Sequence, residues 1–196
     1  MRTTRLSLDP RIYTIDDVLT DVECTRLIAL ARPLLRTSLT VHADGSSKPS
    51  RTRTSSSAYI SHAQVPWLIE RVGRFLGVDE AHVEPPQITR YERGQRYDAH
   101  HDGVDPRGTD GQSFVRDRGQ RVVTLLFYLN DVRRGGATRF QRLRIDVRPR
   151  VGQLLVFYPS RDDLHQIDER LLHSAEPAED TKWVCQIWVR ARAAPS

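Results

Sequence analysis

The chain has 196 residues, 38% of them hydrophobic, which is enough for one globular domain with a sizeable core. No stretch approaches the roughly 18 apolar residues of a membrane-spanning helix, and the first ten residues lack the apolar segment of a secretory signal. We therefore expect a cytoplasmic protein without a membrane partner. The two cysteines are far apart and lack CxxC spacing, which argues against a disulfide framework and against a thiolate metal site.

A net charge of +5 would suit an acidic partner such as nucleic acid. Of the 30 basic residues, all but Lys48 and Lys182 are arginines, and they are interleaved with acids along the whole chain. That pattern is typical of a solvated surface rather than of a binding stripe. We therefore expect nucleic acid not to be the partner.

The N-terminal part predicts a short strand at Ile12 to Ile15, followed by a helix. Thr20 and Glu23 have the Thr-x-x-Glu spacing of a capping box, and Pro33 marks the expected end of the helix. The apolar positions recur at helical spacing, so that one face can cover a sheet. These positions are Cys24, Leu27, Ile28, Ala31 and Leu34 or Leu35.

The segment from His42 to Ser57 is polar and contains Gly45 and Pro49, so we expect a loop that leads into a strand near Ser57 to Ile60. A second capping box, Ser61 to Gln64, predicts a helix that ends at Gly77. Three aromatic residues are interpreted as core residues. They are Trp67, Phe75 and Trp183.

From about residue 82 onward the sequence changes from helical to β character. The strand candidates are Glu84 to Arg93, Arg121 to Asn130, Ala137 to Val147, Gly152 to Tyr158 and Lys182 to Arg192. Helices followed by strands predict an α+β fold, and strands that enclose a site predict a double-stranded β-helix, the jelly-roll of cupin type. We expect a single domain, residues 1–196, with an N-terminal strand and helices at about 10–80 and a jelly-roll core at about 82–192. The long polar loop from Gly103 to Gln120 is a candidate substrate lid.

His100 and Asp102 are a candidate pair of metal ligands. In an extended backbone they project to one side and His101 to the other. A third ligand from a distant strand would complete the two-His-one-carboxylate site of non-haem Fe(II) oxygenases, which leaves positions free for a cosubstrate and O2. The remaining histidines are His42, His62, His82, His165 and His173. His173 is best placed, since it lies between an apolar strand and the closing strand.

The closing strand separates two faces by alternation. Trp183, Cys185, Ile187 and Val189 form an apolar face, whereas Lys182, Val184, Gln186, Trp188 and Arg190 share the other. The second face is predicted to line the barrel interior, which places Lys182 near the metal. A buried ammonium group requires an anionic partner, and a dicarboxylic cosubstrate would be one.

Several motifs occur in a characteristic order. Tyr91 to Asp102 reads Tyr-x-x-Gly-Gln-x-Tyr-x-x-His-x-Asp, Gly135 to Phe140 reads Gly-Gly-x-Thr-x-Phe, and Leu172-His173 is followed by Lys182-Trp183. Upstream, Ile12 to Pro33 and the Arg53-Thr54-Ser55 segment also match. Together they resemble the prolyl 4-hydroxylase family of Fe(II)- and 2-oxoglutarate-dependent dioxygenases over about nine tenths of the chain.

The resemblance implies the roles of individual residues. His100, Asp102 and His173 would bind Fe(II), and Lys182 would pair with the distal carboxylate of 2-oxoglutarate. Hydroxyl groups that would assist in binding this cosubstrate come from Tyr91, Thr138 and Tyr128. Substrate-side groups would be Arg53, Ser55, Glu84, Tyr97, Arg121 and Trp188. Glu84 and Arg121 have an alternative interpretation as a structural ion pair, and Arg121 and Tyr128 have opposite parity, so one of them requires a bulge or a strand edge.

The resemblance also implies oxidative decarboxylation of 2-oxoglutarate to succinate and CO2, coupled to hydroxylation of an unactivated C–H bond, with ascorbate as reductant. A proline in a peptide is the leading substrate, and a free amino acid or small biosynthetic intermediate is the alternative. The chain departs from the family pattern before Lys182, which follows His173 by nine residues after the acidic segment Glu176 to Asp180, with Asp180-Thr181 where a glycine is usual. It departs again at Arg190, which stands where a substrate-side histidine occurs in some members. A nucleic-acid demethylase and a non-catalytic iron or 2-oxoglutarate sensor remain as hypotheses from other classes.

Overall fold

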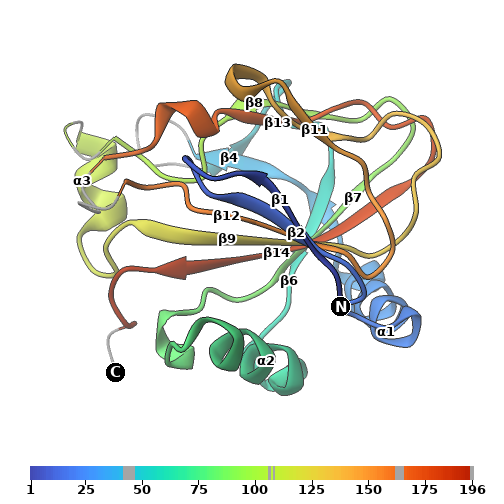
Figure 1. Ribbon diagram of the computed structural model, residues 1–196, viewed down its shortest axis with the longest axis horizontal. Coiled ribbons are helices and arrows are strands. Elements are labelled where there is room, and N and C mark those ends of the chain that lie inside the picture. Colours follow the sequence, from blue (N-terminus) through green and yellow to red (C-terminus); the bar gives the residue numbers. More distant parts are fainter. Residues whose placement is uncertain (42–46, 106, 108, 162–165, 195–196) are drawn as a thin grey trace.

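The computed structural model describes residues 1–41, 47–105, 107, 109–161 and 166–194. Two β-sheets form a jelly-roll, and helices cover the outer face of the larger sheet (Figure 1). The larger sheet has the strand order β1-β2-β12-β9-β14-β7-β6-β3, and the smaller one has the order β11-β10-β13-β8. The pairings between these strands are antiparallel, which confirms the predicted α+β fold with a double-stranded β-helix core.

The larger sheet consists of β1 (Thr3–Ser7), β2 (Ile12–Ile15), β12 (Leu154–Phe157), β9 (Arg121–Tyr128), β14 (Lys182–Arg190), β7 (Gln87–Tyr91), β6 (Ser56–Tyr59) and β3 (Arg36–Thr37). The smaller sheet consists of β11 (Ile145–Val147), β10 (Thr138–Phe140), β13 (His173–Ala175) and β8 (Tyr97–His100). β4 (Leu39–Val41) pairs with β5 (Ser47–Pro49). The helices are α1 (Asp21–Ala31), α2 (Pro66–Leu76) and α3 (Thr109–Val115).

Helix α1 begins at the predicted capping box. The Glu23 backbone N–H donates to Thr20 Oγ1 at 3.2 Å, and the Thr20 N–H donates to Glu23 Oε2 at 2.9 Å. The helix ends at Ala31, and Pro33 lies in the 3-10 turn that follows. Glu23 also accepts from Arg71 Nη2 of α2 at 2.6 Å, so the N-terminus of α1 is joined to the second helix.

Helix α2 begins later than the sequence predicts. The capping box of Ser61 and Gln64 is present but caps a 3-10 turn, and α2 starts at Pro66, a residue suited to the first helical position because it lacks the N–H group that has no partner there. The helix ends at Gly77, whose φ of 69° is left-handed. The prediction that Phe75 is a core residue is wrong: its exposed fraction is 45%, and Leu76 packs against the core instead.

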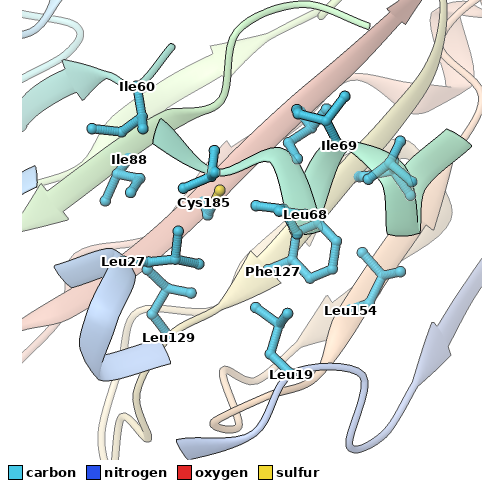
Figure 2. Packing of buried hydrophobic residues seen from close by; sticks show 14 of the residues in the cluster. Leu19, Leu27, Ile60, Leu68, Ile69, Ile88, Phe127, Leu129, Leu154 and Cys185 are labelled. Carbon is cyan, nitrogen blue, oxygen red and sulfur yellow. The ribbon is translucent and has the colours of Figure 1, made fainter. Parts of the chain in front are cut away.

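The main hydrophobic core lies between the helices and the outer face of the larger sheet (Figure 2). Leu27 of α1 and Leu68 and Ile69 of α2 pack there. The sheet contributes Ile88 of β7, Phe127 of β9, Leu154 of β12 and Cys185 of β14. Each fully buried side chain of this size stabilises the fold by about 1.5–3 kcal/mol. Trp183 is buried and Trp67 partly buried in this cluster, in agreement with the sequence.

Alternation along β14 follows the prediction. Trp183, Cys185, Ile187 and Val189 belong to the core under the helices, whereas Val184 belongs to a second cluster between the two sheets. Tyr91, Tyr128, Phe140 and Phe157 also pack in this second cluster.

The predicted bulge occurs in β9. Val189 pairs with Val123, but Arg190 pairs with Arg121, so Val122 is the additional residue. This bulge returns Arg121 to the same face as Thr124 and Tyr128. The strand prediction for 137–147 is corrected, because β10 and β11 are separated by a 3-10 turn at Gln141–Leu143.

Two predicted loops contain regular structure. Of the segment from His42 to Ser57, residues 42–46 lie outside the described residues, and the remainder includes β5 and a bridge between Arg53 and Tyr97. Of the segment from Gly103 to Gln120, residues 106 and 108 lie outside the described residues, and the remainder includes α3. Among the helices that the structure describes, none has both the length and the apolar character to cross a membrane.

Candidate metal centre and substrate cleft

Three potential metal ligands converge at one end of the jelly-roll. His100 ends β8, Asp102 follows two residues later, and His173 begins β13, directly opposite His100 in the strand pairing. One ligand atom from each of the three residues lies within 4.8 Å of the others. The sequence therefore predicted the residues that the fold brings together.

Each imidazole is oriented by a backbone carbonyl. His100 Nδ1 lies 2.9 Å from the Asp98 carbonyl oxygen, and His173 Nδ1 lies 2.9 Å from that of Leu171. A carbonyl only accepts, so both Nδ1 atoms carry the proton and both Nε2 atoms have a free lone pair. The Nε2 atoms of His100 and His173 lie 3.7 and 3.8 Å from Asp102 Oδ1. This arrangement is the usual one for histidines that bind a metal through Nε2.

Asp102 is buried and held from two sides. Thr124 Oγ1 donates to Asp102 Oδ2 at 2.7 Å, and Arg121 Nη1 donates to the Asp102 carbonyl at 3.3 Å. Burial alone would raise the pKa of the Asp102 carboxyl, but the nearby imidazoles of His173 and His100 and the Arg121 guanidinium hold it below its usual value. Thr124 was not predicted, although its inward parity with Tyr128 on the same strand could have indicated it.

The charges of the cluster suit a divalent cation. Burial and the neighbouring His173 lower the pKa of His100 to about 3, so this imidazole is neutral near pH 7. A neutral imidazole and an ionised carboxylate are the forms that bind metals. His101 lies outside the cluster, with its Nε2 3.7 Å from Glu169 Oε2. Among the other candidate histidines, His42 and His165 lie outside the described residues.

Lys182 is the buried cation that the sequence placed near the metal. It is 1% exposed, and its Nζ donates to the Gly136 carbonyl at 2.7 Å. Nζ lies 5.2 Å from the centre of the Tyr91 ring and 5.8 Å from that of Tyr128. Burial lowers the pKa of Lys182 to about 7. Among the described residues no carboxylate forms an ion pair with this ammonium group, and the charge of Glu176 offsets only part of the effect of burial.

A narrow cavity of about 20 Å³ joins Lys182 to the metal ligands. Its lining includes Tyr91, His100, Thr138, His173 and Lys182. Burial raises the pKa of Tyr91 to about 12, so this hydroxyl keeps its proton. Tyr128 lies behind the lining, and its hydroxyl donates to Thr138 Oγ1 at 2.8 Å. Lys182, Tyr91 and Thr138, three of the groups expected to bind the cosubstrate, thus line one cavity, and Tyr128 hydrogen-bonds Thr138.

A larger cleft of about 600 Å³ opens beside the metal ligands. Four of the predicted substrate-side residues line it, namely Arg53, Tyr97, Arg121 and Trp188. The Tyr97 ring stacks on His100 with 3.6 Å between ring centres. The Arg121 guanidinium lies 3.8 Å from the centre of the Trp188 ring. The cleft therefore has aromatic walls that touch the metal ligands.

Two of the predicted substrate-side residues do not line this cleft. Ser55 is buried, with its Oγ 2.9 Å from that of Ser38, and it also hydrogen-bonds Tyr91. Glu84 accepts from Arg121 Nη2 at 2.7 Å and from Arg121 Nε at 2.8 Å. Glu84 and Arg121 thus form the structural ion pair that was the alternative interpretation of these two residues. Cleft residues that sequence reasoning missed include Arg36, Leu39, Tyr59, Gln87 and Phe114.

Comparisons with known proteins agree with this geometry. The family model of the 2OG-Fe(II) oxygenase superfamily matches residues 86–190. A probable prolyl 4-hydroxylase 3 from Arabidopsis thaliana is 31% identical over 209 residues, which cover 94% of this chain and 70% of the relative. A putative prolyl 4-hydroxylase from Acanthamoeba polyphaga mimivirus is 28% identical over 183 residues, covering 92% of this chain and 74% of the relative.

Solved structures show the same architecture. A viral collagen prolyl hydroxylase from Paramecium Bursaria Chlorella virus-1, in complex with 2-oxoglutarate, matches with a TM-score of 0.71 and 25% identity over 92% of this chain and 96% of its own. A prolyl hydroxylase from Trichoplax adhaerens, bound to a peptide of a hypoxia-inducible factor, matches with a TM-score of 0.65 and 19% identity over 91% of this chain and 83% of its own. At 19% identity, the match to the Trichoplax adhaerens protein shows a shared fold and nothing more.

Proposed function

Because this chain belongs to the 2OG-Fe(II) oxygenase superfamily, as a prolyl 4-hydroxylase-like member, we propose that it hydroxylates a proline residue in a peptide or protein. The protein is a dioxygenase that uses Fe(II), 2-oxoglutarate and O2. The observation that carries the proposal is the convergence of the His100, Asp102 and His173 ligand atoms beside a cleft that would hold a peptide.

The donor set fits Fe(II). In our proposal the two Nε2 atoms, which the carbonyls of Asp98 and Leu171 leave free, and the Asp102 carboxylate hold the iron. Bound there, Fe(II) couples the oxidative decarboxylation of 2-oxoglutarate to the insertion of one oxygen atom into a substrate C–H bond. Thr124 keeps Asp102 in place through its hydrogen bond to Oδ2.

Lys182 would bind the distal carboxylate of 2-oxoglutarate. This ion pair would give the buried ammonium group the anionic partner that the Gly136 carbonyl does not provide. The Thr138 hydroxyl accepts a hydrogen bond from Tyr128, so its own proton is free to be donated to the carboxylate. Tyr91, which also lines the narrow cavity, would donate a second hydrogen bond.

The substrate would bind in the larger cleft against Tyr97 and Trp188. Tyr97 stacks directly on His100, so a substrate ring packed against Tyr97 would lie next to the metal centre. Two hydrogen bonds to Glu84 hold the Arg121 guanidinium over the Trp188 ring. The N–H groups of Arg121 therefore have a fixed direction before the substrate binds. We assign Glu84 and Ser55 as positioning residues rather than as groups that touch substrate.

We also infer that residues 1–196 form one domain. β1, β2, β3 and β6 from the N-terminal part share the larger sheet with β7, β9, β12 and β14 from the later part. Separate domains would each need their own core, whereas the cluster under the helices combines residues from both parts.

The experiment that tests the proposed function measures succinate formation with Fe(II), 2-oxoglutarate and ascorbate, together with the mass of the product. The panel contains proline-containing peptides, the same peptides with alanine in place of proline, and free amino acids. We expect succinate and a gain of one oxygen atom only with the proline peptides. Hydroxylation confined to free amino acids would contradict the peptide substrate.

A further inference from the structure

Arg53 is a buried cation, and none of the residue roles proposed above gives it an anionic partner. Its side chain is 7% exposed, and its guanidinium donates only to neutral acceptors. These are Gln87 Oε1 at 2.7 Å, the Leu39 carbonyl at 3.2 Å and Ser57 Oγ at 3.3 Å. Its Nε atom is buried and has no hydrogen-bond partner.

A buried charge of this kind is costly unless an opposite charge accompanies it. No carboxylate of the described residues forms an ion pair with Arg53. The neutral oxygen atoms around it satisfy some N–H groups but do not neutralise the charge. Among the residues that the structure describes, no carboxylate therefore compensates this guanidinium in the wall of the cleft.

Arg53 lies close to the reaction centre. Its guanidinium carbon is 4.7 Å from the centre of the Tyr97 ring, and Tyr97 stacks on His100 at 3.6 Å. One aromatic ring thus separates the guanidinium from a metal ligand. A group bound to Arg53 would belong to the part of the substrate that neighbours the reacting carbon.

The other arginines in and beside the cleft add to its positive charge. Arg36 lines the rim, and among the described residues it has no carboxylate partner. Arg121 and Arg190 share a single carboxylate, since Glu84 lies 2.7 Å from Arg121 Nη2 and 3.6 Å from Arg190 Nη1. Asp102 is the acidic residue of the cleft lining, and its charge faces the two imidazoles.

We propose that the substrate carries a carboxylate next to the residue that is hydroxylated, and that this carboxylate pairs with Arg53. The inference deepens the proposed function and rests on it. The carboxylate can come from an aspartate or glutamate side chain that neighbours the target proline, or from the end of a chain that terminates there. The exposed apolar side chains at the rim, Leu34, Leu39 and Tyr59, would contact the rest of the peptide.

The test measures peptide binding without turnover, with the enzyme loaded with Fe(II) and 2-oxoglutarate under anaerobic conditions. Fluorescent proline peptides of equal length, capped at both ends, carry aspartate, asparagine or lysine beside the proline. A further arm has an uncapped C-terminus directly after the proline. We expect the aspartate or the uncapped peptide to bind at least about tenfold more tightly than the asparagine peptide, because each forms an ion pair with a desolvated guanidinium.

Arg53→Gln should abolish this preference, while Arg51→Gln, which changes an exposed arginine of the same segment, should retain it. Equal binding of the aspartate and asparagine peptides by the wild-type enzyme, with no gain from the uncapped terminus, would overturn the proposal. A preference for lysine would overturn it as well. The wild-type panel decides whether the cleft prefers a carboxylate, and Arg53→Gln, once shown to be folded by its unchanged binding of the asparagine peptide, decides whether Arg53 holds it.

The experiment distinguishes a failure of the proposed function from a failure of the anion site at Arg53. If acidic peptides bind tightly but yield neither succinate nor hydroxylated product in air, the proposed function fails and the anion site stands. If neutral proline peptides are hydroxylated as well as acidic ones, the proposed function stands and the anion site fails.

Discussion

The metal centre and the substrate cleft share Tyr97, His100 and Asp102, yet they differ in how their polar groups are paired. At the metal centre each imidazole has a carbonyl partner and Asp102 has Thr124, so the free atoms all point to one place. In the cleft, Arg53 Nε and Trp188 Nε1 are buried without a partner. The first region is arranged for a small ion and the second for a larger ligand with acceptor groups.

The two regions also come from different parts of the fold. The metal ligands and Lys182 lie in or beside paired strands, whose positions the sheet determines. The cleft adds side chains from the β3 to β4 segment and from α3, which lie outside the two main sheets or at their edge. The metal site is therefore built into the jelly-roll, whereas the cleft combines strand residues with side chains from the irregular segments around it.

The substitution His173→Ala should have the largest effect, because it changes the metal centre and not the cleft. We expect the variant to lose 2-oxoglutarate turnover completely with every peptide, because the iron loses one of its two imidazole ligands. His62→Ala, in the 3-10 turn before α2, is the control that should retain wild-type turnover. His165→Ala should also retain it; loss of activity in His165→Ala with activity preserved in His173→Ala would reassign the third ligand.

Lys182→Ala should act on the cosubstrate alone. Removal of one partner of a buried charge pair typically costs enough free energy to raise the KM for 2-oxoglutarate on the order of 100-fold. The KM for peptide should change little, since Lys182 lines the narrow cavity and not the cleft. Steady-state kinetics with each substrate varied in turn measures both values, with exposed Lys48→Ala as the control. An unchanged 2-oxoglutarate requirement would contradict the assigned role.

Thr124→Val should weaken iron binding without removing a ligand. The substitution keeps the shape of the side chain but deletes the hydrogen bond to Asp102 Oδ2. Loss of such a supporting contact should lower the affinity for Fe(II) about 10-fold. Anaerobic titration with Fe(II) measures the effect, and excess Fe(II) should restore turnover. Wild-type iron affinity in this variant would show that the hydrogen bond has no role in binding.

The pH dependence of cosubstrate binding should follow the charge of Lys182. Burial lowers the pKa of Lys182 to about 7, and a bound carboxylate would raise it again. Below pH 7 the lysine is already charged and affinity should be constant. Above pH 7 binding must take up about one proton, so affinity should fall by up to about tenfold per pH unit. Calorimetry in buffers of different ionisation enthalpy measures this uptake, and Lys182→Ala should abolish it.

Patterns with a local physical cause were predictable from the sequence. Alternation placed Lys182 and Trp188 on the inward face of β14, and the capping box located the start of α1. The parity conflict between Arg121 and Tyr128 predicted a bulge or a strand edge, and the structure has the bulge, at Val122. These features depend on steric rules within one element, so a single sequence contains them.

Features that depend on tertiary packing were not predictable. Nothing local distinguishes Phe75, which is exposed, from Leu76, which packs against the core. Ser55 faces Ser38, a partner that only the folded chain brings to it, whereas the ion pair of Glu84 and Arg121 was one of two interpretations of the sequence. The neutral surroundings of Arg53 likewise appear only when the contacts of its guanidinium within the described part of the chain are known.

The most direct test of the central claim is an anaerobic titration of the protein with Fe(II) and 2-oxoglutarate, followed by the visible charge-transfer absorption of chelated iron. The wild-type protein should develop this absorption at one equivalent of each. Lys182→Ala should require much more 2-oxoglutarate, and His173→Ala should not develop the absorption under the same conditions. A full charge-transfer band in His173→Ala, with wild-type affinity for both components, would contradict the assignment of this site.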